Sequence, residues 1–355
     1  MPHPFPSLAA LLPEDGAALV TSEVNRRYLT GFSSSMGVLL ITRDCARFLA
    51  DSRYIEAARA EVQACETAEL TRLREQLPAL LREWGISVLL LEAGSVTLAE
   101  AAQYRKWLPD VTLETGPALD QAIEALRVRK RDWEVARIRQ AQRIAEAALT
   151  EVRPLLQPGR TEREIALALD YAMLRGGADA LSFETIAVGG ENSAKPHGVP
   201  GGRALRDGDF LTLDFGAVVD GYHSDMTRTI AIGTPSEEMR RVYKIVLAAQ
   251  EAALAALRPG LPCREADAAA REIIAAAGYG DSFRHGLGHG VGVEIHEAPT
   301  LSARSEGILA PGHVVTIEPG IYLPGRFGVR VEDMALITES GYENLTAAGK
   351  ELSSK

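Results

Sequence analysis

FLTLDFGAVVDGYHSDMTRTI, residues 210–230, is a stretch with the pattern of a β-hairpin. Segments rich in β-branched and aromatic residues flank the pair Asp220-Gly221. An Asp-Gly pair in that setting is the strongest short-range signal for a hairpin turn. A two-residue turn there predicts that Asp214 faces Thr227 across the ladder.

Asp214 and Asp225 both lie inside the predicted strands, where aspartate is depleted because it packs poorly. The same turn places Asp225 diagonally from Asp214 on one face of the ladder. Two carboxylates that close on a buried face are unfavourable unless a cation or a shared proton compensates them. We therefore predict that both are metal ligands.

The composition is that of an ordinary water-soluble protein of one large or two smaller domains. The chain has 355 residues, of which 46% are hydrophobic and 24% charged, and a net charge of -10 that argues against nucleic acid or an anionic membrane as partner. Its longest apolar runs, such as residues 88–91, are too short to span a bilayer, and residues 1–16 lack a secretory signal pattern. Three widely spaced cysteines, Cys45, Cys65 and Cys263, favour a reducing compartment, so we expect a cytoplasmic protein without disulfides.

The pattern predicts an α+β protein with a small α/β domain over residues 1–120, a connector over 121–131 and a second domain over 132–355. In the first domain, hydrophobic periodicity predicts strands at 37–42, 46–50 and 86–91 and helices at 54–63, 71–84 and 98–107. Arg53 lies between these elements; it can be a residue that reaches a site elsewhere, or a solvated or structural arginine.

An internal repeat lies in the second domain. PGRTERE at 158–164 matches PGLPCRE at 259–265, and LRDGDFLTLDFG at 205–216 matches LAPGHVVTIEPG at 309–320. The second match aligns Asp214 with Glu318. Two matching blocks in one order favour a duplication over chance similarity, and a pseudo-two-fold axis would bring the two carboxylates together.

The second copy and the segment before it add further ligand-type residues. RHGLGHGVGVEIHE, residues 284–297, holds His285, His289 and His296 among glycines, and VRVEDM supplies Glu332. A dinucleotide loop is disfavoured because GxGxxG in its strand-to-helix context is missing, and a structural zinc site would favour cysteine ligands.

One imidazole and four carboxylates form the predicted ligand set, namely Asp214, Asp225, His289, Glu318 and Glu332. This donor set suits manganese, cobalt, iron or zinc, and its oxygen-rich character favours manganese. Four negative charges call for more than one divalent cation, and paired metals are the usual arrangement in hydrolases.

Five ordered motifs, LDFGA, SDMTRT, GHGVG with a following HE, IEPG and VRVED, resemble the metal-binding motifs of the pita-bread metallopeptidases. This is the fold of methionine aminopeptidase, aminopeptidase P and prolidase, and the resemblance covers residues 132–350. It implies two divalent ions per subunit: Asp214 on one, His289 and Glu318 on the other, and Asp225 and Glu332 bridging both. It also implies a duplicated catalytic domain.

The N-terminal segments YLTGFSSSMGVLLIT and FLADSRYIEAA resemble the creatinase-like domain of Xaa-Pro peptidases. Within that branch, the resemblance implies that His197, His285 and His296 line the substrate site and that Arg330 lies beside the bridging glutamate. It implies a catalytic part for Glu318, His296 and His197, and substrate binding by His197, His285, His296 and Arg330. A homodimer is expected on the same ground.

The resemblance predicts hydrolysis of the peptide bond that precedes proline. Xaa-Pro dipeptides are the favoured substrates, which makes the expected activity that of a prolidase. Aminopeptidase P, which acts on longer Xaa-Pro peptides, is the alternative. A protein that binds peptides without cleaving them is a third possibility, and the presence of all five metal-ligand residues argues against it.

Overall fold

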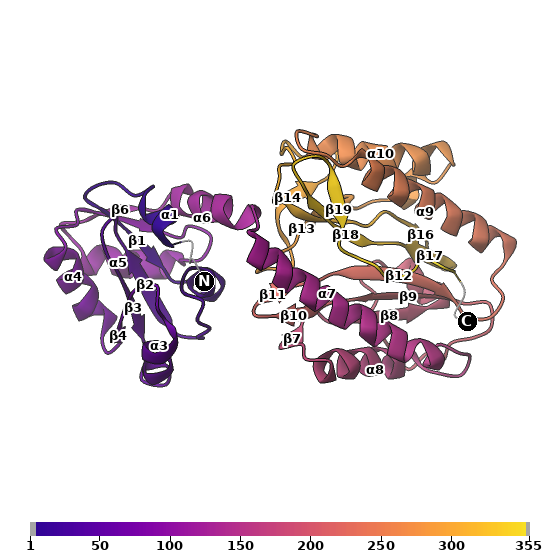
Figure 1. The fold of residues 1–355 in the computed structure, drawn as a ribbon, viewed down its shortest axis with the longest axis horizontal. Coiled ribbons are helices and arrows are strands. Elements are labelled where there is room, and N and C mark those ends of the chain that lie inside the picture. The colour runs from indigo at the N-terminus through magenta and orange to yellow at the C-terminus, as the bar shows by residue number, and fades with distance from the viewer. Residues whose placement is uncertain (1–4, 353–355) are drawn as a thin grey trace. The chain divides into compact units, whose positions relative to one another are not determined.

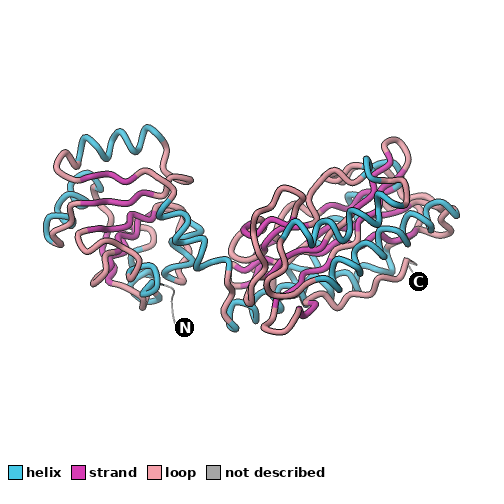
Figure 2. The backbone as a smooth tube through the Cα atoms, turned by 90° about the horizontal axis from the view of Figure 1, so that it is seen from above, coloured by secondary structure: helices cyan, strands magenta, loops and turns pink. Residues whose placement is uncertain are grey.

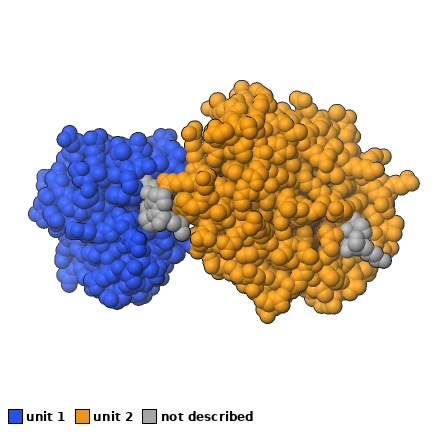
Figure 3. All heavy atoms as spheres, in the orientation of Figure 1, with its two compact units in different colours: residues 1–127 blue, residues 128–355 orange. Residues whose placement is uncertain are grey.

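A computed structural model describes residues 5–352 of the chain. The chain divides into two compact units, residues 1–127 and residues 128–355, which Figure 3 draws in different colours. Among the described residues, no helix combines the length and the apolar character that crossing a bilayer requires.

The first unit is built on one six-stranded sheet with the strand order β4-β3-β2-β1-β5-β6. Its strands are β1 (Gly16–Val20), β2 (Gly37–Ile41), β3 (Ala46–Ala50), β4 (Glu66–Glu69), β5 (Val88–Leu91) and β6 (Thr112–Glu114). The β1–β2 and β2–β3 pairs are antiparallel and the other pairs are parallel. The strands predicted at 37–42, 46–50 and 86–91 correspond to β2, β3 and β5.

Helices alternate with these strands, as parallel neighbours require. They are α1 (Phe5–Ala9), α2 (Glu23–Thr30), α3 (Ile55–Glu61), α4 (Leu73–Glu83), α5 (Leu98–Trp107) and α6 (Ala118–Val128). The predicted helices at 54–63, 71–84 and 98–107 correspond to α3, α4 and α5. Leucines of α4 pack with residues of β1, β2 and β5 in one hydrophobic cluster, so the α/β character expected for this region is present.

In the second unit, antiparallel sheets lie between two pairs of helices (Figures 1 and 2). One pair is α7 (Asp132–Val152) with α8 (Glu162–Arg175), and the other is α9 (Glu237–Ala256) with α10 (Cys263–Ala276). Each pair packs its apolar face on strands in a separate hydrophobic cluster. A capping box of Thr161 and Glu164 starts α8, because each side chain bonds to the backbone N–H of the other.

The sheets of this unit are short and antiparallel. The first half forms the sheets β12-β9-β8 and β11-β10-β7, and the second half forms β14-β13-β15-β18-β19 and β16-β17. First-half strands are β7 (Ala180–Leu181), β8 (Ile186–Gly189), β9 (Phe210–Phe215), β10 (Ala217–Val219), β11 (Tyr222–His223) and β12 (Met226–Ala231). Second-half strands are β13 (Gly288–Gly290), β14 (Glu297–Leu301), β15 (Val314–Ile317), β16 (Gly320–Leu323), β17 (Phe327–Arg330), β18 (Asp333–Ile337) and β19 (Tyr342–Asn344).

The duplication is visible in equivalent backbone contacts. α8 and α10 each have 14 residues and follow the two Pro-Gly turns. The N–H of Gly159 donates to the carbonyl of Leu205 at 2.9 Å, and the N–H of Gly260 donates to the carbonyl of Leu309 at 2.8 Å. The two halves therefore repeat one helix-helix-strand plan, as the sequence repeat predicted.

The predicted hairpin is present, but its ladder is interrupted before the turn. Asp220 (φ 48°) and Gly221 (φ 76°) both have positive φ, as a hairpin turn of the I′ type requires, and Asp214 pairs with Thr227. The ladder is interrupted at Gly216, where a Cβ atom would lie 1.9 Å from the carbonyl oxygen of Ser224. Only glycine permits this close approach, which separates β10–β11 from β9–β12.

Candidate metal centre and active site

Five side chains converge from both halves of the second unit. Asp214 lies near the end of β9, and Asp225 immediately precedes β12. His289 is the central residue of β13, Glu318 directly follows β15 and Glu332 directly precedes β18. All five line one cavity, so the residues predicted as metal ligands lie together.

The distances within this group are those of potential ligands to shared ions. Asp225, His289 and Glu332 each offer a ligand atom within 4.8 Å of the others. The Nε2 atom of His289 lies 3.3 Å from Oε1 of Glu318 and 3.6 Å from Oδ2 of Asp225. A divalent ion can therefore contact several of these oxygens and the imidazole at once.

Neighbouring groups set the orientation of the imidazole and of two carboxylates. Nδ1 of His289 lies 3.1 Å from the carbonyl oxygen of Gly290, which accepts a hydrogen bond from Nδ1–H, so in the neutral imidazole the lone pair that can bind a metal is on Nε2. The Thr227 hydroxyl donates to Glu332 at 2.6 Å, and the Thr316 hydroxyl donates to Glu318 at 3.1 Å.

Arg330 connects Asp214 to a second hydrogen-bond chain. Its buried guanidinium forms an ion pair with Oδ2 of Asp214 and donates to the Tyr322 hydroxyl at 2.8 Å. That hydroxyl lies 3.0 Å from Nε2 of His285, whose Nδ1 lies 2.8 Å from the carbonyl of Gly286. Because Nδ1 donates to the carbonyl, Nε2 accepts from Tyr322.

The carboxylates are strongly perturbed by burial and by one another. Burial raises the pKa of Asp225 and Glu332 well above the usual range, and neighbouring carboxylates raise it further: Glu332 acts on Asp225, and Glu318 acts on Glu332. Burial also raises the pKa of Asp214, although Arg330 opposes the shift. Burial alone would raise the pKa of Glu318, but the hydrogen bond and charge of His289 lower it to about 2.

The cavity that contains this group has a volume of about 930 Å³. The other histidines from the sequence prediction, His197, His285 and His296, also line it, as does Arg330. The ring centroids of His289 and His296 are 4.4 Å apart. Apolar side chains complete the wall, among them Phe183, Ile186, Val199, Ile295 and Pro324.

These residues fit a pair of divalent metal ions. Four carboxylates share one buried region with one imidazole, and Arg330 alone cannot balance their charge. The Oδ1 atom of Asp214 is buried without a hydrogen-bond partner among the described residues. A buried carboxylate oxygen left this way is expected where a cation binds.

Sequence reasoning missed several residues of the site. Thr316 lies on β15 and precedes Glu318, the residue directly after that strand, by two positions, so the two-residue period signalled a shared face. Tyr322 and Arg284 also line the cavity, and no local pattern marked them. Arg53 belongs to the first unit, where it forms an ion pair with Asp51 at 2.6 Å, so its contribution to a site stays a prediction.

The comparison with known families decides the classification. The sequence profile "Metallopeptidase family M24" matches residues 136–339, and "Creatinase/Prolidase N-terminal domain" matches residues 14–129. The chain belongs to metallopeptidase family M24. This M24 metallopeptidase thus has the N-terminal domain and the pita-bread catalytic domain that the sequence motifs implied.

Several similar proteins are described as Xaa-Pro peptidases. The Xaa-Pro dipeptidase of Pyrococcus furiosus is 46% identical over 234 residues, 66% of this chain and 67% of that protein. The structure of an Xaa-Pro dipeptidase from Bacillus anthracis superposes with a TM-score of 0.93 at 39% identity, over 98% of this chain and 97% of the other. An X-Pro aminopeptidase from Thermotoga maritima gives a TM-score of 0.91 at 34% identity, over 97% and 99%.

Proposed function

We propose that this M24 metallopeptidase hydrolyses the peptide bond before proline, with Xaa-Pro dipeptides as its main substrates. The observation that carries the proposal is the convergence of Asp214, Asp225, His289, Glu318 and Glu332 in one cavity. Two named relatives, the dipeptidases of Pyrococcus furiosus and Bacillus anthracis, support the dipeptide preference.

The five converging side chains would hold two divalent ions, with manganese favoured over cobalt or zinc because most donors are carboxylate oxygens. Asp214 would serve one ion, His289 and Glu318 the other, and Asp225 and Glu332 would bridge both. Ions bound there would make a water molecule more acidic and polarise the scissile carbonyl group.

Glu318 is our candidate for the proton shuttle. Burial alone would raise the pKa of Glu318, but the hydrogen bond and charge of His289 lower it to about 2, so the carboxylate is deprotonated near neutral pH and can accept a hydrogen bond from the attacking water. In the proposed reaction it accepts a proton from the attacking water and passes it to the proline nitrogen as the carbon-nitrogen bond breaks.

His296 and His197 would donate hydrogen bonds to the carbonyl oxygen as negative charge builds on it. Burial lowers the pKa of His296, so its ring is neutral near pH 7 and still carries one N–H donor. His285 would help to shape the subsite for the proline ring, because Tyr322 and the ring of Phe283 hold it on the cavity wall.

An aminopeptidase of the P type is the second candidate. A dipeptidase needs a cation for the free carboxylate of proline, and Arg330 already donates to Asp214, Thr227, Tyr322 and the carbonyl of Pro196. Its predicted substrate-binding role stays a prediction. Arg284 is an exposed arginine on the same cavity wall, and we propose it as the carboxylate-binding residue of a dipeptidase.

A homodimer in the cytoplasm completes the proposal. The cytoplasmic location draws support from Cys45, Cys65 and Cys263, all of which are free thiols in the structure. Sedimentation velocity of the full chain would test the dimer directly.

The deciding experiment uses protein stripped of metal and reloaded with Mn²⁺, and follows the products of three peptides by mass spectrometry. We expect cleavage of Leu-Pro, little cleavage of Leu-Pro-Gly and none of Met-Gly-Gly. Release of leucine mainly from Leu-Pro-Gly would assign the aminopeptidase activity instead. No cleavage with two metals bound would favour a peptide-binding protein. Glu318→Gln is the matched control, and full turnover by that variant would remove the shuttle role.

A further inference from the structure

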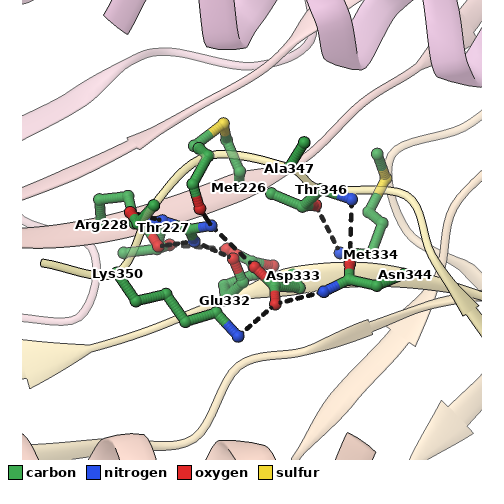
Figure 4. Close-up of polar contacts among 12 residues, drawn as sticks. Met226, Thr227, Arg228, Glu332, Asp333, Met334, Asn344, Thr346, Ala347 and Lys350 are labelled. Atoms are coloured by element: carbon green, nitrogen blue, oxygen red, sulfur yellow. Dashed lines mark hydrogen bonds and ion pairs between the residues drawn. The ribbon is translucent and has the colours of Figure 1, made fainter.

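Arg228 is a fully buried arginine of the second unit, and every N–H of its guanidinium group has an acceptor. Its side chain donates to the carbonyls of Thr227 (2.9 Å) and Glu332 (2.6 Å) and to Oδ1 of Asp333 (2.8 Å). It also donates to the carbonyls of Ala348 (2.7 Å) and Gly349 (3.0 Å). Figure 4 shows Arg228 with Thr227, Glu332 and Asp333.

The contacts of Arg228 span a gap between two sheets. Asp225 immediately precedes β12, and Glu332 immediately precedes β18, but β12 and β18 belong to different sheets and share no ladder. The separation of the two proposed bridging carboxylates therefore depends on contacts between the strands. Arg228 supplies two of them, to the carbonyl of Glu332 and to Oδ1 of Asp333, and the hydrogen bond from the N–H of Glu332 to the carbonyl of Thr227 (3.1 Å) supplies another.

Asp333 balances the charge of Arg228. Both side chains are almost completely buried, and a buried charge is costly unless it is paired and hydrogen-bonded. The other carboxylate oxygen of Asp333 accepts from Gln250 at 3.0 Å and Asn344 at 2.9 Å and lies 2.6 Å from Nζ of Lys350. Asp333 thus joins Arg228 to α9, β19 and the segment after β19 (Figure 4).

Residues 347–352 contribute to this network although they form neither helix nor strand. Besides the two carbonyls that Arg228 contacts, the carbonyl of Lys350 accepts from the Tyr243 hydroxyl at 2.8 Å. The carbonyl of Leu352 accepts from the N–H of Ala231 on β12 at 2.7 Å. The segment is therefore fixed against α9 and against the strand that follows Asp225.

We propose that Arg228, Asp333 and residues 347–352 form a positioning network that sets the spacing of Asp225 and Glu332 and thereby the affinity of the centre for metal. The proposal rests on the metal centre of the proposed function. None of the network residues is assigned to contact substrate, so they act through the two carboxylates. Substitution of residues that hold metal ligands in place commonly lowers metal affinity by about 10- to 100-fold.

The test compares Asp333→Asn with Asp209→Asn. Like Asp333, Asp209 pairs with an arginine, here Arg203 through two hydrogen bonds of 2.7 and 3.0 Å, but it does not line the cavity. Mn²⁺ affinity is measured by calorimetry on metal-stripped protein, the coupling of two bound Mn²⁺ ions by electron paramagnetic resonance, and the melting temperature by calorimetric scanning. We expect Asp333→Asn to weaken Mn²⁺ binding about 10-fold or more and to alter the resonance spectrum.

Asp209→Asn is expected to lower the melting temperature while changing Mn²⁺ affinity by less than about twofold. Two milder variants keep the proposal testable if Asp333→Asn does not fold. Lys350→Met affects a side chain that is 22% exposed and should weaken Mn²⁺ binding about threefold to tenfold. Arg228→Lys should also bind Mn²⁺ more weakly, and a high Mn²⁺ concentration should partly restore its metal occupancy. Unchanged Mn²⁺ affinity and spectrum in folded Asp333→Asn and Lys350→Met would overturn the proposal.

Metal binding is measured without a peptide substrate, so the proposed peptidase activity and the proposed positioning network can fail separately. Wild-type protein that binds two Mn²⁺ ions and cleaves no Xaa-Pro peptide would refute the proposed function and leave the network supported or refuted by its own variants. Wild-type protein that binds no divalent ion would refute both.

Discussion

The two halves of the catalytic unit share one scaffold and differ in what their loops add to it. Each half places two helices before a hairpin, and each supplies two carboxylates: Asp214 and Asp225 from the first, Glu318 and Glu332 from the second. The segment between α10 and β15 adds His285, His289 and His296 to the cavity, whereas the segment between α8 and β9 adds one histidine. Duplication thus accounts for the symmetry of the oxygen donors, and divergence of one loop accounts for the imidazole.

Two equivalent carboxylates of the repeat have different neighbours. Asp214 and Glu318 align in the repeat and lie at the ends of equivalent strands. Their surroundings differ, because Arg330 pairs with Asp214 while His289 approaches Glu318. Each neighbour opposes the effect of burial: at Asp214 burial outweighs Arg330 and the pKa is raised, whereas at Glu318 the hydrogen bond and charge of His289 outweigh burial and the pKa falls to about 2.

The largest expected effect comes from two single substitutions, one in each half, at the carboxylates that we propose to bridge the two ions. Asp225→Asn and Glu332→Gln should each lower kcat/KM for Leu-Pro by about 10³-fold or more, because the loss of a shared ligand removes several kcal/mol of metal stabilisation. Metal content by mass spectrometry should fall in parallel for both variants. Loss in only one of them would show that the two halves do not contribute equally.

The histidines of the two loops allow a second comparison. His296→Ala should lower kcat about 10²- to 10³-fold with little change in KM, because a hydrogen bond to a developing oxyanion acts mainly in the transition state. His197 is exposed on the cavity wall, and His197→Ala should have a smaller effect of about 10-fold. Steady-state kinetics at saturating Mn²⁺ separate the two parameters, and an unchanged kcat in His296→Ala would exclude its oxyanion role.

The parts of this site that the sequence predicted are those with a local or periodic signal. The Asp220-Gly221 turn fixed the pairing of Asp214 with Thr227, and the repeat aligned Asp214 with Glu318. The contacts of Arg228 and Arg330 carry no such signal. Each guanidinium bonds to groups about a hundred residues away in the chain, so only the folded backbone reveals them.

A smaller effect is expected for substitution of Arg284, which lies in the segment between α10 and β15 and lines the cavity wall. Arg284→Met should raise KM for Leu-Pro about 10-fold and leave KM for Leu-Pro-amide nearly unchanged, because a hydrogen bond to a charged group contributes about 1.5–3 kcal/mol. Arg258→Met, at an exposed position that does not line the cavity, is the matched control. Equal changes for both substrates would mean that Arg284 does not bind the carboxylate.

The smallest effect is a pH dependence of the metal-free protein, in which carboxylates of both halves are close together without a cation. Because the folded-state pKa values of Asp225 and Glu332 are raised by burial, the folded protein holds protons that the unfolded chain releases above about pH 4. That stability is present at low pH and is lost as the pH rises through the folded-state values. Between pH 5.5 and 8, wild-type metal-free protein should therefore lose about 3 °C more in melting temperature than Asp225→Asn, which also removes the charge that faces Nε2 of His289. Calorimetric scans of both proteins measure the difference, and equal slopes would mean that the two carboxylates do not share protons in the absence of metal.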